Sequence, residues 1–182
     1  MSTTNKNYDF FPETNPEFGA DPGFGNLYVV EHGNVLAFAT EPVIGAAEGD
    51  LRKTDGDHTF AAGKGFRKIS FYRGDSQTDG NMPGDPGFKS KVYEVKGFIA
   101  GSKAKTREFA ENLRNKAVLV LQEEPNCEET VLAQHGCACK PVYVKDVKFT
   151  SGSQITGGKK GYEIIFESMC WFDYDGVVTM KA

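Results

Sequence analysis

The fold is decided by the stretch from Lys91 to Gln122, in which a strand, a helix and a second strand follow one another. It opens with Lys91-Val-Tyr-Glu-Val-Lys-Gly-Phe-Ile99, where polar and apolar side chains alternate as in a half-buried strand. The period then changes, and helical spacing links Thr106, Phe109, Ala110 and Leu113. The stretch closes with Ala117-Val-Leu-Val-Leu121, a continuous apolar run that predicts a strand buried on both faces.

The predicted helix covers residues 102–114. Ser102 suits the N-cap because its hydroxyl can accept a hydrogen bond from an orphan amide of the first turn. Asn115 is placed to end the helix. A single helix among strands must pack on a sheet, so the chain is predicted to be mainly β, with two packed antiparallel sheets and one flanking helix.

Hairpins are predicted on both sides of this stretch. Leu27–Val30 and Val35–Phe38 are joined by a turn in which Gly33-Asn34 can supply positive φ angles. Val142–Thr150 alternates, with Val142, Val144, Asp146 and Lys148 on one face, and is expected to form a hairpin with a long strand over 162–172. Residues 45–65 and 74–87 are predicted as long loops, which usually contact something else.

Composition and length predict one β-rich domain over residues 27–182, preceded by an extended arm over 1–26. The chain has 182 residues, including 21 glycines and 14 phenylalanines, which is typical of aromatic-rich strands joined by turns. The arm contains prolines and glycines without a sustained period. Its phenylalanines, which are costly to leave in water, predict a contact with a partner surface: Phe10, Phe11, Phe18 and Phe24.

Charge and termini narrow the function classes. The net charge of −4 and a pI near 5.4 give no basic footprint for nucleic-acid phosphates. No secretory signal or membrane-spanning run is visible, so we expect a protein made and folded in a cytosol, without membrane association. Four cysteines fit that reducing compartment as free thiols.

The cysteines are the main candidates for chemistry. Cys127, His135, Cys137 and Cys139 have the side chains that zinc prefers, but Cys-x-Cys lacks the usual knuckle spacing of two to four residues. Reduced structural thiols are therefore the favoured interpretation, with zinc and redox chemistry as alternatives. No third residue can orient His135 toward a Cys137 nucleophile, and His32 and His58 fall in turns where we expect them solvated. The sequence predicts no catalytic site and no cofactor.

The order of elements resembles the tail tube proteins of long-tailed bacteriophages, particularly those that infect Bacteroidetes. The resemblance covers roughly residues 90–180, where a strand, the helix 102–114 and the strand 117–121 precede a hairpin ending in Gly161-Tyr-Glu-Ile-Ile-Phe166. Proteins of this family form stacked hexameric rings whose inner sheets line a channel for DNA. The resemblance implies a structural virion protein, not an enzyme, made in the host bacterial cytoplasm and located in the tail. Its implied partners are further copies of itself, other tail proteins, and double-stranded DNA that passes without specific binding.

On this interpretation, Met82 and Phe88 join the arm's phenylalanines as subunit-interface residues. The lumen is predicted to be lined by the strands 91–99 and 142–150, with Glu94 and Asp146 facing the channel and the lysines of these strands either pointing outward or paired with those carboxylates. Two alternatives remain. One is another virion protein, such as a head–tail connector or decoration protein. The other is a carbohydrate-binding β-sandwich with Trp171 and Tyr174 as an exposed stacking platform.

Overall fold

The computed structural model describes residues 25–42, 52–71, 75–87, 89–101, 103–124, 131–151 and 159–181. Within these ranges the chain is mainly β with one α-helix, which confirms the predicted fold class. The predicted arm 1–26, apart from its last two residues, lies outside the described residues, as do Phe88, Ser102 and Cys127. The described part of the chain contains no helix long and apolar enough to cross a membrane.

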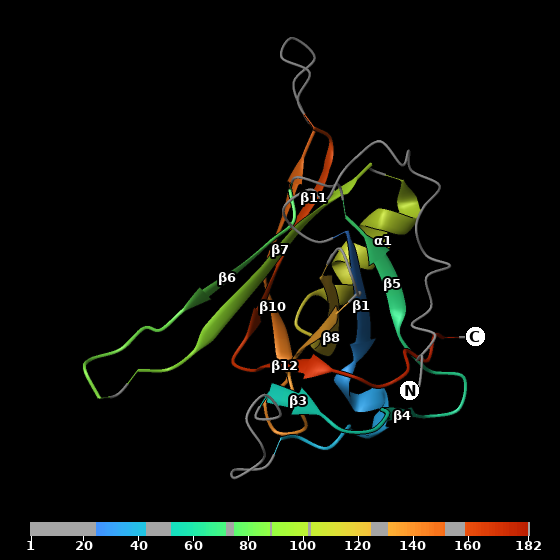
Figure 1. Cartoon of the computed structure of the whole chain (residues 1–182). Coiled ribbons are helices and arrows are strands. Elements are labelled where there is room, and N and C mark those ends of the chain that lie inside the picture. Colours follow the sequence, from blue (N-terminus) through green and yellow to red (C-terminus); the bar gives the residue numbers. More distant parts are fainter. Residues whose placement is uncertain are drawn as a thin grey trace, which may run out of the picture.

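Ten of the described strands form one hydrogen-bonded sheet (Figure 1). They are β1 (Asn26–Glu31), β3 (Lys53–Thr54), β5 (Arg67–Ser70), β6 (Gln77–Asn81), β7 (Val92–Ala100), β8 (Ala117–Glu124), β9 (Val131–His135), β10 (Val142–Thr150), β11 (Gly161–Ser168) and β12 (Trp171–Tyr174). The pairs are antiparallel except β12 with β3, so the two sheets expected from the sequence are hydrogen-bonded into one. A separate two-stranded sheet pairs β2 (Val35–Ala37) with β4 (Thr59–Phe60).

Strand β8 is the branch point of the large sheet. One edge pairs with β1, and the other pairs first with β10 and then with β9. Val118 and Val120 enter one apolar cluster, whereas Leu119 and Leu121 enter a second cluster on the opposite face, and all four side chains are fully buried. The predicted strand buried on both faces is therefore confirmed, and the two clusters explain why every position of the run is apolar.

Helix α1 (Ala104–Leu113) packs against the first of these clusters through Ala110 and Leu113, with Phe109 at its border. The predicted helical stripe is confirmed. The helix begins later than predicted: Lys103 is the N-cap residue and makes no side-chain capping bond. Its last residue is Leu113, and Asn115 closes it as predicted, because its φ of 60° is a left-handed conformation that asparagine tolerates and that stops the helix.

Two predictions of local pairing are wrong. Residues 27–38 do not form a hairpin, because a short 3₁₀ turn, η2 (His32–Asn34), separates β1 from β2 and the two strands join different sheets. The two expected loops also contain strands: β3 and β4 lie within 45–65, and β6 lies within 74–87 and pairs along β7. The sequence Gln77-Thr-Asp-Gly-Asn has little strand propensity, so its pairing depends on the backbone edge that β7 offers.

The long strand predicted over 162–172 is interrupted after Ser168, and the predicted alternation in β10 is reset by a bulge. The bulge lies between Val144 and Asp146 and leaves Lys145 as the extra residue. It allows Val142, Val144 and Val147 to share the buried face, which strict alternation would forbid. Lys145 and Asp146 consequently lie on the opposite face, away from the core.

Candidate functional site

The first candidate site is a charged face on four consecutive strands of the large sheet, in the order β6, β7, β11 and β10. Their inner side chains, among them Val95, Ile164 and Phe166, are fully buried in the cluster that α1 also contacts. Alternation along each strand, together with the β10 bulge, places eight charged side chains on the other face, all half-buried or exposed. We call this the charged face, and it consists of Asp79, Glu94, Lys96, Lys145, Asp146, Lys148, Glu163 and Glu167.

Lysines on this face separate carboxylates that would otherwise repel one another. The strand register places Asp79 opposite Glu94, and Lys96 Nζ lies 2.8 Å from the first carboxylate and 3.2 Å from the second. The register also places Glu94 opposite Glu167, and Lys145 bonds to both, with Nζ 3.2 Å from the Glu167 oxygen. An ion-pair chain therefore crosses all four strands, because each lysine offsets a like-charge contact.

The pairing keeps these groups charged over a wide pH range. The hydrogen bond from Lys145, followed by the one from Lys96, lowers the pKa of the Glu94 carboxyl. The same bonds raise the pKa values of Lys96 and Lys145, through Asp79 first for Lys96 and through Glu94 first for Lys145. The face holds five carboxylates and three lysines, so its net charge of −2 persists at neutral pH.

Both residues predicted to face the lumen lie on the charged face. Glu94 pairs with two lysines, and Asp146 pairs with Lys148 at 3.2 Å. The lysines of the two predicted lumen strands that lie on this face are thus paired in the manner that the interpretation required. Sequence reasoning missed Asp79 because its strand was assigned to a loop. It also missed Glu163 and Glu167, although their alternation with Ile164 and Phe166 was a usable signal.

Both ends of the charged face have an open strand edge among the described residues. Strand β6 is the last in the sheet order, and β10 beyond Tyr143 pairs only with β11. A groove of about 570 Å³ runs beside that part of β10, between the strand and helix α1. Arg107, Glu111 and Arg114 line it from the helix, while Val144 and the half-exposed Phe149 line it from the strand. Open edges of this kind can accept a further strand.

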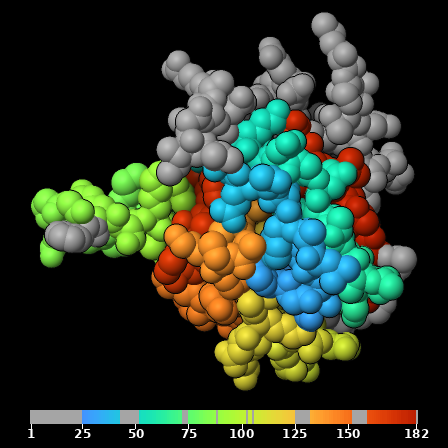
Figure 2. Space-filling view, turned by 90° about the horizontal axis from the view of Figure 1, so that it is seen from below, coloured from blue at the N-terminus to red at the C-terminus, as the bar shows by residue number. Residues whose placement is uncertain are grey.

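Beyond Asn81 the β6–β7 hairpin extends into a second arm, distinct from the predicted N-terminal arm, which we call the projecting arm. It stands away from the body of the molecule (Figure 2). Every described residue from Asn81 to Lys91 is exposed, and Met82 keeps 60% of its surface in contact with solvent. One backbone hydrogen bond, from Ser90 N to Pro83 O at 3.0 Å, closes the arm on itself. Of the predicted interface residues only Met82 can be placed, since Phe10, Phe11, Phe18, Phe24 and Phe88 lie outside the described residues.

Comparisons of the chain with known protein families, with curated proteins and with solved structures find no match. The functional argument therefore depends on the chain's own geometry.

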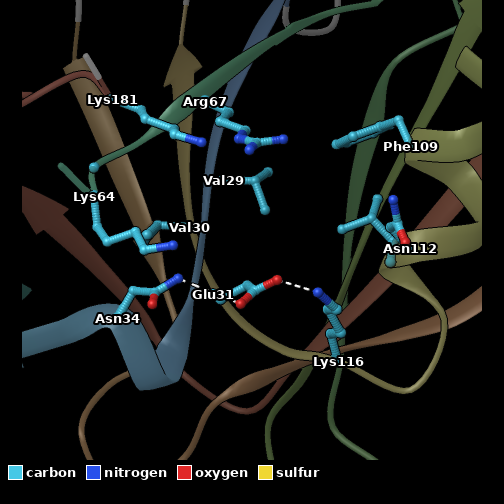
Figure 3. Close-up of a pocket in the computed structure, with 12 residues that line it drawn as sticks. Val29, Val30, Glu31, Asn34, Lys64, Arg67, Phe109, Asn112, Lys116 and Lys181 are labelled. Carbon is cyan, nitrogen blue, oxygen red and sulfur yellow. Dashed lines mark hydrogen bonds and ion pairs between the residues drawn. The ribbon is translucent and has the colours of Figure 1, made fainter. Parts of the chain in front are cut away.

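A second candidate site is a basic pocket of about 230 Å³ between β1, α1 and the C-terminal segment (Figure 3). Lys64, Arg67, Lys116 and Lys181 surround Glu31, which bonds to Lys116. That bond is the main cause of the lowered pKa of the Glu31 carboxyl. Four cations and one carboxylate leave an excess of positive charge that suits an anionic group. The sequence indicated none of this, because the residues come from four separate segments.

The alternative zinc set of Cys127, His135, Cys137 and Cys139 can be followed only in part, because Cys127 lies outside the described residues. His135 is fully buried, its Nε2 lies 3.1 Å from Gln122 Oε1, and burial lowers its pKa to about 3. Cys137 and Cys139 do meet, with their sulfurs 3.6 Å apart. Burial raises the pKa of the Cys137 thiol to about 12, the opposite of what a nucleophile needs. Two further residues approach these thiols, Cys170 and Glu41.

The prediction that His58 is solvated is wrong. Its side chain is 2% exposed and stacks on Tyr174 with ring centroids 4.8 Å apart. The Ala39 amide donates to Nδ1 at 3.0 Å, so Nε2 carries the proton and donates to Gln134 at 2.9 Å. His58 is thus a core residue with both ring nitrogens hydrogen-bonded.

The aromatic pair proposed as a carbohydrate platform does not form an exposed surface. Tyr174 is 2% exposed. Trp171 is half-buried, and the Arg52 guanidinium lies 4.7 Å from its ring centroid. A sugar would have to displace that cation to stack on the indole, and Tyr174, the second ring of the proposed platform, is buried.

Proposed function

We propose that this chain is a structural subunit that assembles into a tube, as the resemblance to phage tail tube proteins implies, with the charged face lining the channel. The observation that carries the proposal is the ion-pair chain on this face, in which Lys96, Lys145 and Lys148 are each paired with a carboxylate. A channel for DNA must not bind its cargo, because every lysine that pairs with a phosphate releases counterions and adds affinity. Paired lysines and a net negative charge meet that requirement.

The open strand edges support a ring of copies. A neighbour's β6 can continue the sheet beyond the open part of β10, so that four strands from each copy form one closed inner sheet. Closure removes both edges, which would otherwise be sites of uncontrolled pairing. Helix α1 lies on the core side of these strands, so it would face outward in such a ring.

The projecting arm supplies a second contact. Its exposed Met82 and the half-exposed Phe149 beside the groove are apolar side chains that gain by leaving water. We assign the groove between α1 and β10 to the arm of a neighbouring copy. The predicted interface role of the phenylalanines in residues 1–26 and of Phe88 forms part of the same proposal.

Electron microscopy of the purified full-length protein tests the proposal. We expect rings or stacked tubes with an open channel. Met82→Asp and Phe149→Asp should each abolish assembly while leaving the melting temperature of the subunit unchanged. Leu36→Asp is the matched control, because Leu36 is 71% exposed on β2, which belongs to the separate two-stranded sheet, and should leave assembly intact.

The result also separates the alternatives. Single rings that never stack would favour a connector, and binding to preformed capsids without ring formation would favour a decoration protein. A protein that stays monomeric at high concentration, with Met82→Asp and Phe149→Asp indistinguishable from the parent, would overturn the assembly proposal.

A further inference from the structure

Three cysteines from two distant parts of the described chain meet at one end of the large sheet. Cys137 Sγ lies 3.6 Å from Cys139 Sγ and 3.6 Å from Cys170 Sγ. The Glu41 carboxylate joins them: its oxygen and the sulfurs of Cys137 and Cys139 all lie within 4.8 Å of one another. Cys137 is thus the centre of a set of four soft and hard donors contributed by three segments.

The backbone holds these donors in place. Cys137 and Lys140 exchange two hydrogen bonds, with N–H to O distances of 3.0 Å and 3.3 Å, which close a tight turn between β9 and β10. The Cys139 amide donates to the Cys137 sulfur. The Ser168 hydroxyl bonds to both the amide and the carbonyl of Cys170, at 3.1 Å and 2.7 Å. The turn reverses the chain at Cys-x-Cys and so brings both thiols to one point, although their spacing is shorter than in the usual zinc knuckle.

We propose that Cys137, Cys139 and Cys170, with Glu41 as fourth ligand, bind a structural zinc ion. Tetrahedral zinc with Zn–S bonds near 2.3 Å requires sulfurs about 3.8 Å apart, close to the two observed separations. A disulfide has an S–S length of about 2.0 Å, and it would use only two of the three thiols. Glu41, Cys137 and Cys139 already lie within 4.8 Å of one another, and the Cys170 thiol, which touches Cys137 alone, would turn toward the ion to complete the tetrahedron.

Binding releases the thiol protons, because thiolates are the ligands. Three thiolates and one carboxylate around Zn²⁺ carry a net charge of −2, which the neighbouring Lys140 partly offsets through its electrostatic interaction with Cys170. The ion would link the β9–β10 turn, the β11–β12 connection and the segment after β2. Its role is therefore to fasten this end of the sheet, independent of any function in assembly.

Metal content is the direct test. The full chain, purified without an affinity tag or chelator, should contain one zinc per chain by mass spectrometry of the metal. Cys139→Ser is the first variant to use, because Cys139 is exposed and the change should not prevent folding. It should lose most of the zinc, as should Cys170→Ser, whereas Glu41→Gln should weaken binding at least tenfold in a chelator competition.

Cys127→Ser and His135→Gln are the controls, since both residues belong to the zinc set that the sequence offered as an alternative and neither belongs to the set proposed here. Both should retain zinc. Cobalt in place of zinc should give a thiolate charge-transfer band that weakens stepwise in Cys139→Ser and Cys170→Ser. Chelation should lower the melting temperature of the parent and leave that of Cys139→Ser unchanged.

Three outcomes would overturn the proposal. One is a folded parent that neither contains zinc nor binds it when zinc is added to reduced protein. The second is an intramolecular disulfide involving Cys137 in protein prepared without oxygen. The third is loss of zinc in Cys127→Ser with full retention in Glu41→Gln, which would show a different ligand set.

Discussion

Glu94 and Lys145 form an ion pair that passes over β11, the strand that separates their own strands β7 and β10. The β10 bulge makes Lys145 the extra residue of its strand, and Lys145 also bonds to Glu167 on β11. One lysine therefore neutralises two carboxylates that face each other across the β7–β11 pair.

This pair leads to a prediction about DNA. Glu94→Lys removes the shared partner of Lys96 and Lys145 and adds a fourth lysine between them, so the charged face changes from a net charge of −2 to neutral. We expect the assembled variant to bind double-stranded DNA, with an affinity that falls steeply as salt rises. Filter binding at several salt concentrations measures this. Glu108→Lys on the exposed side of α1 is the charge-matched control, and equal DNA binding by both variants would contradict the proposed channel.

The helix–sheet contact predicts a graded loss of stability. Leu113 is 5% exposed in the core cluster, so Leu113→Ala should lower the free energy of unfolding by about 2–5 kcal/mol. Phe109→Ala should lower the free energy of unfolding by less than the same substitution of a fully buried phenylalanine would. The reason is that Phe109 is only half-buried at the edge of the basic pocket. Urea denaturation measures both, with Glu108→Ala as a surface control expected within about 0.5 kcal/mol of the parent. A larger loss for Phe109→Ala than for Leu113→Ala would contradict the packing, because it would place Phe109 and not Leu113 at the centre of the helix–sheet contact.

Gly97 is predicted to tolerate no side chain. A Cβ at this position would lie 2.6 Å from atoms of the Phe71 ring, which packs directly on the strand. Gly97→Ala should therefore destabilise the protein by about 1–3 kcal/mol through overpacking, and adding Phe71→Leu should recover part of the loss. Gly33→Ala is the control, because nothing lies within 4 Å of its Cβ position. Thermal unfolding of the three variants would test this, and an unchanged Gly97→Ala would contradict the close contact.

Two buried histidines predict a loss of stability in mild acid. Burial lowers the pKa of His58, and it lowers that of His135 to about 3, whereas both titrate near 6.5 in the unfolded chain. As pH falls below about 6.5, the unfolded state binds protons that the native state excludes, so unfolding becomes easier by up to about 1.4 kcal/mol per pH unit for each histidine. Above that pH the two histidines cause no loss of stability, because both are neutral in the folded and in the unfolded chain.

Denaturation between pH 7 and pH 5 measures this effect, because the lowered pKa values of Glu31, Asp79 and Glu94 keep these carboxyl groups ionised there. Burial raises the pKa of the Glu124 carboxyl, which acts in the opposite direction, so a histidine variant is needed to assign the slope. His135→Gln should flatten the pH dependence of the free energy of unfolding, because it removes the titrating imidazole. His135 Nδ1 has no hydrogen-bond partner, so the substitution loses no bond at that atom. A variant with the slope of the parent would show that the buried imidazole accepts a proton in the folded state.

Patterns within a short stretch were predictable from sequence. The run Ala117–Leu121 is apolar at every position because β8 separates two apolar clusters, and a strand between two cores has no solvated side. The helical stripe through Ala110 and Leu113 and its end at Asn115 follow from equally local rules. Glu94 on a solvated face followed from alternation in its own strand.

What only the tertiary structure decided are the relationships between distant segments. Strand β1 pairs with β5 and β8 instead of its neighbour β2, and β6 is a strand because β7 offers it an edge. Cys170 reaches Cys137 although 33 positions separate them, and no periodicity marks such a meeting. Side-chain spacing reports which face of an element is buried, whereas pairing and clustering depend on how the whole chain closes around its cores. That closure is a sum of many weak long-range contacts that no single stretch of sequence contains.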